Sequence, residues 1–534
     1  MKKIIYVVAG VAIVFASSCK KYLDINDNPN SVIASTPDLV LPQAIVGTAA
    51  ITNGDYSNGI GADLMYRVNA GGFSGFGTVI SYDYVPGTFT AAWSDTYDNT
   101  NDYKYIMDNT AGKPNYIYFN AVARIMHAYL FGMLVDQYDN IPYSQALKGK
   151  DNVNPAYDKG VDIYKSLAAQ LDTGIALINT GLANALSVTP FTLASDPLFS
   201  QSGPNMVAWK QFANTVKLRL IVRAGGKVTF NNTNFSTDGF LTTDALVNPG
   251  YTKVAGKISP IFPYSATNAA TASSRLPSTF VVSFYDGTKL NDQKRGNVVF
   301  RNWPNPPSNQ LGNETTPTPP NSPVPNSWIK PSINATTGLY NATITGTDYG
   351  NVGIMKDYVQ GVPLITAAES YFLQSEAVVR GYMTGDAMAL FNKGIEASFT
   401  YLYKTGANVV PASGPYSAPA ADATAYIAAN TANRLANFAL ALTTEQKVEA
   451  IITQKFIALN MISMHEGWNE YRRTGYPAVT GTGPTQTMAS TVSLSTRPDR
   501  MPTRFPYPSS EVNTNSANIP GGIDKFKTLL FWSK

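Results

Sequence analysis

The sequence contains few of the residues on which metal sites and nucleophilic catalysis depend. It has one cysteine, Cys19, and two histidines, His127 and His465. These are too few for an intrachain disulfide framework, a multi-cysteine or multi-histidine zinc site, or a catalytic cysteine with a histidine near it. No cofactor and no bound metal are therefore expected.

Charged residues are also scarce, at 14% of the 534 residues, against about 25% in an average domain. The formal net charge of +4 is too small and too evenly spread to predict a nucleic-acid partner. Asn, Thr, Ser, Gly and Tyr supply the polar groups instead, and 34 prolines and 41 glycines indicate many loops. Hydrophobic residues still make up 44% of the chain, enough for a sizeable core.

The sequence has no apolar run long enough to span a membrane. Near the N-terminus, twelve apolar residues from Ile4 to Phe15 follow Lys2 and Lys3. As a helix this run would rise only ~18 Å, short of the ~30 Å hydrocarbon core of a bilayer. Residues 1–18 are therefore predicted to be a cleaved signal peptide.

Cys19 follows the small residues Ala16, Ser17 and Ser18, an arrangement that resembles a lipobox, although Leu is more common than Ala at position 16. Processing would leave Cys19 as a new N-terminus carrying a diacylglyceryl thioether and an N-acyl (palmitoyl) chain, and two chains already suffice for stable anchoring. The mature chain has 38 basic and 36 acidic residues, so lipid rather than charge would hold it to a membrane. The alternative is an ordinary secretory peptide in which Cys19 has no special role.

Residues 19–42 are polar and interrupted by Asn and Pro, which predicts an extended tether. Within it, Asp24, Asn26 and Asn28 have the spacing that begins an EF-hand loop. Pro29 stands where that loop needs glycine, so calcium binding of this kind is not expected.

Six later segments carry apolar residues at the spacing of one helix face. They are residues 118–132, 161–178, 209–220, 364–378, 387–398 and 448–462. The helical period disappears between about 230 and 361, where nine prolines between Arg301 and Asn334 indicate a long irregular loop. The predicted fold class is mainly α.

Small side chains recur in the predicted helix pair at 364–398. Tyr371, Ser375, Ala387, Phe391 and Gly394 fall close to the spacing of large and small residues in tetratricopeptide repeats. Small residues there let two helices approach closely, so that stacked pairs can bury one continuous core. The pattern is degenerate, and an unspecialised helical hairpin is the alternative.

Two segments suggest catalysis at first, and each has a simpler explanation. His465 and Glu466 begin like a zincin motif, but Asn469 occupies the position of the second histidine. Glu466 and Glu470 share a helix face beside two arginines, which favours a charge-paired surface or a clamp between helices over a glycosidase acid–base pair. His127 lies in an apolar helix, which favours an interior or groove histidine over a general base.

Six phrases of sequence are spread over nearly the whole mature chain. They are CKKYLDINDNPN (19–30), DQYDNIPYSQAL (136–147), WKQFANTVKLRLIVR (209–223), ESYFLQSEAVVRG (369–381, continuing through 385–398), QKFIALNMISMHEGWNEYRRTGYP (454–477) and RFPYPSSEVN (504–513). Together and in this order they resemble the SusD/RagB family of outer-membrane nutrient-binding lipoproteins.

The resemblance implies one SusD-like domain over residues 43–534. Its scaffold of tetratricopeptide-like helix pairs would cover about 43–229 and 362–475, and its irregular region about 230–361 and 476–534. The resemblance also implies a lipoprotein of the outer membrane that closes over a SusC-like TonB-dependent transporter. Its ligands would be oligosaccharides, or peptides as in some relatives. Family ligand residues share no motif, so only the lipidation site Cys19 is carried over.

Aromatic residues are abundant, with 31 Tyr, 24 Phe and 6 Trp. A sugar ring presents C–H groups on one face and hydroxyls at its edge, so exposed aromatic rings beside amides or carboxylates suit it. Trp93, Trp209 and Trp468 lie in predicted helices and are expected in the core. The loop candidates for ligand contact are Phe73, Phe76, Tyr82, Asp83, Tyr84, Arg301, Trp303, Asn305 and Trp328. The alternative is that these aromatics pin their loops to the scaffold or contact the transporter.

The sequence thus predicts a non-catalytic lipoprotein, anchored in the outer membrane and facing the exterior, that binds an oligosaccharide and delivers it to a SusC-like TonB-dependent transporter. Three alternatives remain. They are a peptide-binding member of the same family, a surface glycoside hydrolase, and a purely structural interaction protein built on helical repeats.

Overall fold

In the computed structural model of the protein, the residues described are 35–71, 76–192, 194–199, 205–252, 254, 256–261, 275–300, 303–314 and 352–534. The predicted signal peptide and lipidation site Cys19 lie outside these residues, as do the candidates Phe73, Arg301 and Trp328. None of the helices in the described ranges has the length and apolar character needed to cross a membrane.

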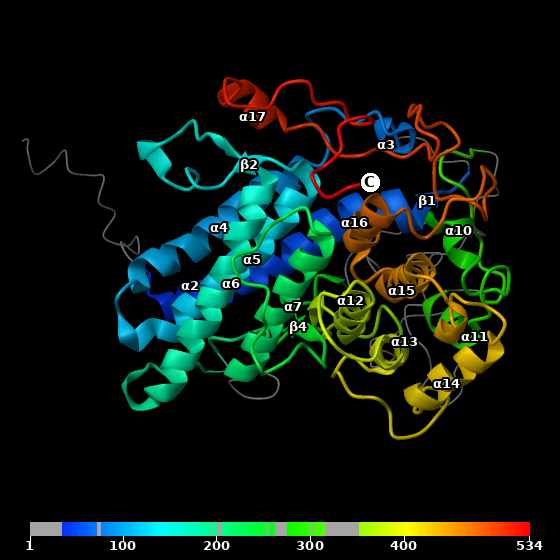
Figure 1. Ribbon diagram of the computed structural model, residues 1–534, viewed down its shortest axis with the longest axis horizontal. Helices are drawn as coiled ribbons and strands as arrows, with labels where there is room; N and C mark the ends of the chain where they lie inside the picture. Colours follow the sequence, from blue (N-terminus) through cyan, green and yellow to red (C-terminus); the bar gives the residue numbers. More distant parts are fainter. Residues whose placement is uncertain are drawn as a thin grey trace, which may run out of the picture.

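The long helices form two groups that lie side by side (Figure 1). The first group consists of α2 (Pro37–Ile51), α4 (Thr90–Thr110), α5 (Ile117–Tyr138), α6 (Gly160–Ala183) and α7 (Met206–Ala224). Helices α4 to α7 pack each against the next, and α2 packs across α4 and α5. This order buries helix α5 on nearly all sides, including its histidine, His127.

The second group consists of α12 (Ala367–Val379), α13 (Ala387–Tyr403), α14 (Pro419–Ala429), α15 (Thr444–Leu459) and α16 (Met464–Thr474). Helix α12 contacts α13 and α15 within the group and α7 of the first group, so the two groups share one core. Local signals start these helices: the Asp386 side chain accepts from the first-turn amides of α13, and Thr443 and Gln446 form a capping box on α15.

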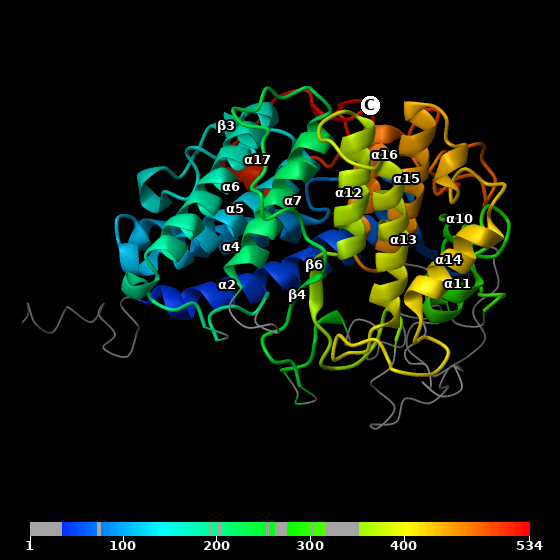
Figure 2. The ribbon, with the colours of Figure 1, turned by 60° about the horizontal axis from the view of Figure 1, so that its bottom comes forward.

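A continuous rod joins the two groups. Helix α2 runs directly into a π-helix, η1 (Thr52–Tyr66), which packs against α16. Figure 2 shows the blue rod running beneath the first group and then passing behind α12. The prediction of an extended tether over 19–42 is therefore wrong from Pro37 onward. Proline is tolerated at the first helical position, which Pro37 occupies. The helix continues through Pro42 because the burial of Leu41, Ile45 and their neighbours stabilises it.

The remaining elements are short. The helices are α3 (Thr78–Ser81), α10 (Thr279–Val282), α11 (Gln293–Val299), α17 (Ser509–Thr514) and the 3₁₀ turns η2 (Pro114–Tyr116), η3 (Gly149–Asp151), η4 (Ala185–Ser187) and η6 (Phe438–Leu440). Three antiparallel strand pairs join β1 (Arg67–Asn69) to β5 (Arg275–Pro277), β2 (Ile141–Pro142) to β3 (Tyr157–Asp158), and β4 (Ala245–Val247) to β6 (Val362–Ile365).

The six predicted helical segments are confirmed as α5, α6, α7, α12, α13 and α15, and the mainly α fold class is confirmed with them. Two boundaries differ: residues 362–365 form strand β6, so that helix begins only at Ala367, and α15 ends at Leu459, before the predicted end at 462. The three helical tryptophans, Trp93, Trp209 and Trp468, are buried as predicted.

The hairpin of α12 and α13 shows why small residues recur there. A Cβ atom on Gly394 would lie 2.6 Å from the ring of Phe372, so only glycine permits this approach. The Ser375 hydroxyl donates to the carbonyl of Ala387 at 2.7 Å. The spacing that resembles a tetratricopeptide repeat therefore marks a close contact between the two helices.

Candidate binding site

The loops after β1, around β5 and α11, and after α16 form one irregular surface, called here the loop face (residues 67–71, 76–90, 275–300, 303–314 and 476–508). In Figure 1 its elements α3, β1 and α10 lie near the orange C-terminal loops. The pairing of β1 with β5 brings the first two loops together. The amide oxygen of Asn69 accepts from the Gly312 amide at 2.8 Å, and the Gln310 side chain donates to the carbonyl of Ala489 at 3.0 Å. Three distant parts of the sequence thus make one surface.

Tyr82 and Tyr84, two of the predicted ligand contacts, are buried, so neither offers an exposed ring face to a sugar. The Tyr82 hydroxyl accepts from the Ser490 amide at 3.2 Å, and the ring of Tyr84 packs against Phe505 at 4.9 Å. For these two residues the expectation of an exposed stacking platform is wrong. Their rings pin the loop before α4 to the C-terminal segment.

Asp83 and Phe76 lie on the same loop and keep part of their surface exposed. The Asp83 carboxylate pairs with Lys525, whose ammonium also donates to the carbonyl of Tyr84 at 3.1 Å. The guanidinium of Arg275 lies 4.4 Å from the ring centre of Phe76, within cation–π distance. These contacts hold both side chains at the loop face.

Trp303 is partly exposed and Asn305 is exposed on the segment that follows α11. The indole of Trp303 stacks on Phe300 with 5.9 Å between ring centres, lies over Gly296, and donates from Nε1 to Gln293 at 2.9 Å. One part of this side chain thus fixes its loop to α11, while the rest faces out of the loop face.

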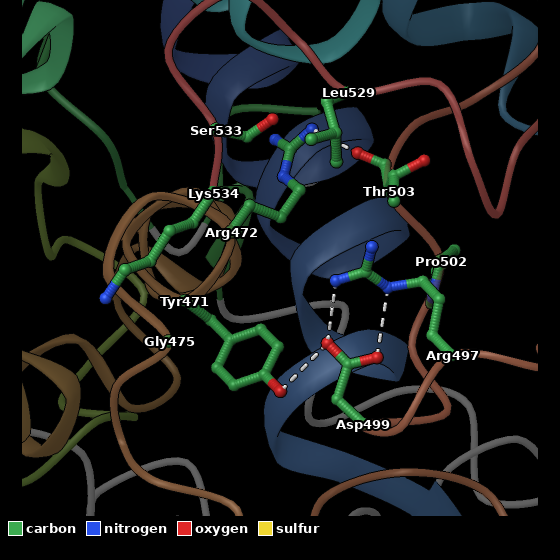
Figure 3. A pocket seen from close by; sticks show the side chains of 10 residues that line it. All are labelled: Tyr471, Arg472, Gly475, Arg497, Asp499, Pro502, Thr503, Leu529, Ser533 and Lys534. Atoms are coloured by element: carbon green, nitrogen blue, oxygen red, sulfur yellow. Dashed lines mark hydrogen bonds and ion pairs between the residues drawn. The ribbon is translucent and has the colours of Figure 1, made fainter.

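A cavity of about 270 Å³ opens where the C-terminal end of α16 meets the last segments of the chain (Figure 3). It is lined by Tyr471, Arg472, Gly475, Arg497, Asp499, Pro502, Thr503, Leu529, Ser533 and Lys534. The sequence did not predict this cavity, because its lining comes from three segments without a shared motif. The only signal was the density of charged and aromatic residues in the phrase that ends at Pro477.

Polar groups on two sides of the cavity are held by neighbouring side chains. Arg497 donates two hydrogen bonds to Asp499, at 3.1 and 3.2 Å, and the Tyr471 hydroxyl donates to the same carboxylate at 3.3 Å. Arg472 stacks on the ring of Trp468 at 3.5 Å, and its Nη1 donates to the carbonyl of Thr503 at 3.2 Å. Figure 3 shows the Arg472 guanidinium directed toward Thr503, apart from the Arg497–Asp499 pair.

The motif of Glu466 and Glu470 is a buried clamp between helices, one of the two explanations that its sequence favoured. Arg223 of α7 pairs with Glu466, and Lys455 of α15 pairs with Glu470 at 2.9 Å. Arg473 joins the cluster by its pair with Glu470. Both carboxylates are buried in ion pairs, so neither faces a cleft that a glycosidic bond could enter.

Burial and charge act in opposite directions on the carboxylates of this clamp. Burial by itself raises the pKa of Glu466, but the charges of Arg223, Arg219 and Lys455 outweigh it and hold the pKa well below its usual range. For Asp136, which also pairs with Arg223, burial prevails and raises the pKa to about 6. Glu466 therefore remains ionised near neutral pH and keeps the helices paired.

Neither histidine lies where it could act on a substrate. His127 is an interior residue, as predicted, and burial lowers its pKa to about 3; burial likewise lowers the pKa of His465 to about 4. Across the described ranges, no three His, Cys, Asp or Glu side chains gather into a group that could hold a metal ion.

Solved structures with the same fold are numerous. A SusD homologue from Bacteroides fragilis aligns with a TM-score of 0.64 at 20% identity over 93% of this chain and 99% of its own. A chitin-binding SusD homologue from Flavobacterium johnsoniae aligns with a TM-score of 0.62 at 22% identity over 92% and 98%, respectively. A SusD homologue from Bacteroides uniformis has a TM-score of 0.61 at 23% identity over 93% and 99%.

Two family models match the sequence. One, described as SusD and RagB outer membrane lipoprotein, matches residues 334–533, and the other, described as starch-binding and associating with the outer membrane, matches residues 29–244. Comparison with curated proteins found no match. The two family matches lie at opposite ends of the chain, together cover most of it, and agree with the fold, so the chain belongs to the SusD/RagB family of outer-membrane lipoproteins.

Proposed function

We propose that this protein is a lipid-anchored receptor on the outer face of the outer membrane. It binds an oligosaccharide without cleaving it and passes it to a SusC-like TonB-dependent transporter. Membership of the SusD/RagB family carries the proposal. The starch-binding description of one family model and the chitin-binding relative with the same fold favour a glycan over a peptide.

The loop face supports the same function. It presents partly exposed aromatic rings, Phe76 and Trp303, together with the polar side chains of Asp83 and Asn305. Rings suit the C–H face of a sugar, and amides and carboxylates suit its hydroxyls. Because Trp303 is fixed on α11 and Phe76 is held by Arg275, binding would require little ordering of these side chains.

The test is a glycan array and a peptide pool presented to the full chain, purified in detergent. Retention of oligosaccharides, recovered with their length unchanged after incubation, is the expected result. Shortened products would overturn the non-catalytic proposal, and preferential retention of peptides would favour the peptide-binding alternative. Failure to retain either, combined with tight binding to a transporter, would favour a structural role.

The loop face is tested with Trp303→Ala, measured on a glycan that the array identifies. We expect binding at least about tenfold weaker, the order of loss for a stacking aromatic ring. Tyr116→Ala is the matched control, because Tyr116 is also partly buried and lies at the connection between α4 and α5, where its ring packs against Phe119. Equal affinities of the two variants would remove Trp303 from the site.

A further inference from the structure

We propose that the cavity between α16 and the C-terminal segments binds a carboxylate-bearing sugar, a uronic acid residue of the captured glycan. The inference rests on the proposed glycan-binding function and adds the chemical class of one sugar unit. The residues that would hold it are Arg472, Tyr471, Arg497 and Asp499.

The size of the cavity suits a single ring. Its volume of about 270 Å³ lies just below the roughly 300–1,000 Å³ of pockets that enclose drug-sized molecules. The wall includes the aromatic side chain of Tyr471 and the apolar side chains of Pro502 and Leu529. A wall of this kind accepts the C–H face of one pyranose, while the rest of an oligosaccharide would remain outside.

Arg472 supplies the attraction for a carboxylate. Its side chain is only 6% exposed, yet its hydrogen bonds run to uncharged acceptors: the carbonyls of Thr503 and Asp136 and the side-chain oxygens of Asn469 and Gln137. Its Nε has no hydrogen-bond partner. Within the described residues Arg472 forms no ion pair. The carboxylate of Asp136 attracts its charge, but burial outweighs that attraction and drives the pKa of Arg472 well below its usual range, and a buried guanidinium compensated so incompletely is costly. A ligand carboxylate would supply the missing countercharge.

The Arg497–Asp499 pair completes the site with groups for sugar hydroxyls. Asp499 is the one acidic side chain of the lining, and Arg497 neutralises it. Its carboxylate can accept from a hydroxyl, while Ser533 can donate or accept. Lys534, the other cationic side chain of the lining, pairs with Glu445 at 3.5 Å. The side-chain charge left over on the wall is therefore positive at Arg472, which distinguishes an acidic sugar from a neutral one.

The experiment is calorimetric titration of the full chain in detergent with trigalacturonic acid, with its fully methyl-esterified form, and with the glycans of the array. The ester keeps the sugar rings and removes the charge. We expect the acid to bind at least about tenfold more tightly than the ester, the order of difference that a charge-assisted hydrogen bond in a buried site provides.

Two variants test whether the acid binds in this cavity, because they are expected to change its affinity in opposite directions. Arg497→Gln leaves Asp499 as an unpaired carboxylate and should weaken binding of the acid by about fivefold, whereas Asp499→Asn frees Arg497 and should strengthen it by about fivefold. The ester should change within about twofold. Both side chains are partly exposed, at 30% and 21%, so the variants should fold.

A control is the pair of Arg434 and Glu449, in which Arg434 donates two hydrogen bonds to one carboxylate oxygen of Glu449 on α15, outside the cavity lining. Arg434→Gln and Glu449→Gln should leave both titrations unchanged. Equal binding of acid and ester, or shifts of the same sign in the two cavity variants, would overturn the inference while array glycans still bind. Failure of every glycan to bind would overturn the proposed function as well.

Discussion

Acidification should destabilise the fold through its two histidines. Both are buried, and burial lowers the pKa of His127 to about 3 and that of His465 to about 4. In the unfolded chain each returns to about 6.5. Between pH 6.5 and about 4 the unfolded state therefore binds protons that the folded state does not, so the free energy of unfolding falls as the pH falls.

The contacts of the two rings explain why the fold keeps them neutral. Nδ1 of His127 lies 3.0 Å from the side-chain amide nitrogen of Gln170, which can donate only to an unprotonated ring nitrogen. Neither ring nitrogen of His465 has a hydrogen-bond partner, and the edge of Tyr56 packs beside it. A second ring proton on His127 would face the Gln170 amide group. One on His465 would be attracted by Glu466, 3.7 Å from Nε2, but burial outweighs that attraction.

The size of the effect follows from the difference between the pKa of each histidine in the folded chain and its pKa in the unfolded chain. At pH 5 each histidine is 1.5 pH units below its ordinary pKa, so each lowers the free energy of unfolding by about 2 kcal/mol relative to pH 7, and the two together by about 4 kcal/mol. Domains commonly have about 5–15 kcal/mol in total. Asp136 acts in the opposite direction, because its pKa is raised to about 6 and the folded state binds its proton first.

The assay compares the natural chain with a variant without histidines, so that the difference between them reports the contribution of the histidines to the pH dependence of unfolding. Urea unfolding is measured at pH 7 and pH 5 for the natural chain and for the double variant His127→Gln, His465→Phe. Asp136 and all other titrating groups are common to both chains, and no histidine remains in the variant. We expect the natural chain to lose about 4 kcal/mol more than the variant between the two pH values. Equal losses would mean that the buried rings titrate normally, and the reasoning would fail.

Three further predictions concern the anchor, the hairpin and the clamp. Cys19→Ala should move the protein from the membrane fraction to the supernatant on cell fractionation, and unchanged retention would contradict a lipid anchor. Gly394→Val should cost about 2–4 kcal/mol in chemical unfolding, since its side chain would overlap a buried phenylalanine ring; Gly87→Ala, in open space, should be neutral, and similar values for the two would contradict the close approach. Arg223→Met removes the guanidinium shared by the buried carboxylates of Asp136 and Glu466, although Glu466 keeps a longer pair with Arg219 at 4.0 Å, and should cost about 3–5 kcal/mol. Lys104→Met, in an exposed pair, should cost less than about 0.5 kcal/mol.

The scaffold was predictable because its signal is local and periodic. Apolar residues at helical spacing located α5, α6, α7 and their counterparts in the second group within a few residues. Helix α2 was not predicted because its two prolines, in a polar context, resemble a linker. The packing that stabilises the helix despite them comes from α4 and α5, which lie far along the sequence. The π-helix η1 was not predicted for a related reason. Its glycines suggest a loop, and its packing against α16 cannot be read from the sequence.

The binding surface was predictable only in part. Aromatics in the loop 71–84 were recognised as important, but composition could not separate the buried rings of Tyr82 and Tyr84 from the partly exposed ring of Phe76. That difference depends on where the C-terminal segment crosses the loop, which is a contact between residues about 400 positions apart. The cavity of Figure 3 was missed for the same reason, since its lining is assembled from three segments.

Helix α16 connects the scaffold to this cavity. Its buried side carries Glu466, Glu470 and Arg473 into the ion-paired clamp, while Tyr471 and Arg472, from the same turns, line the cavity. Although the chain has few charged residues, several of them pair helix α16 with α7, α15 and, through Arg473 and Glu376, with α12. Buried ion pairs of this kind favour one arrangement over alternatives more than they add stability. The cavity wall is thereby held in place before a ligand arrives, which lowers the entropy lost on binding. Weakening the clamp should therefore reduce ligand affinity even where the cavity residues themselves are unchanged.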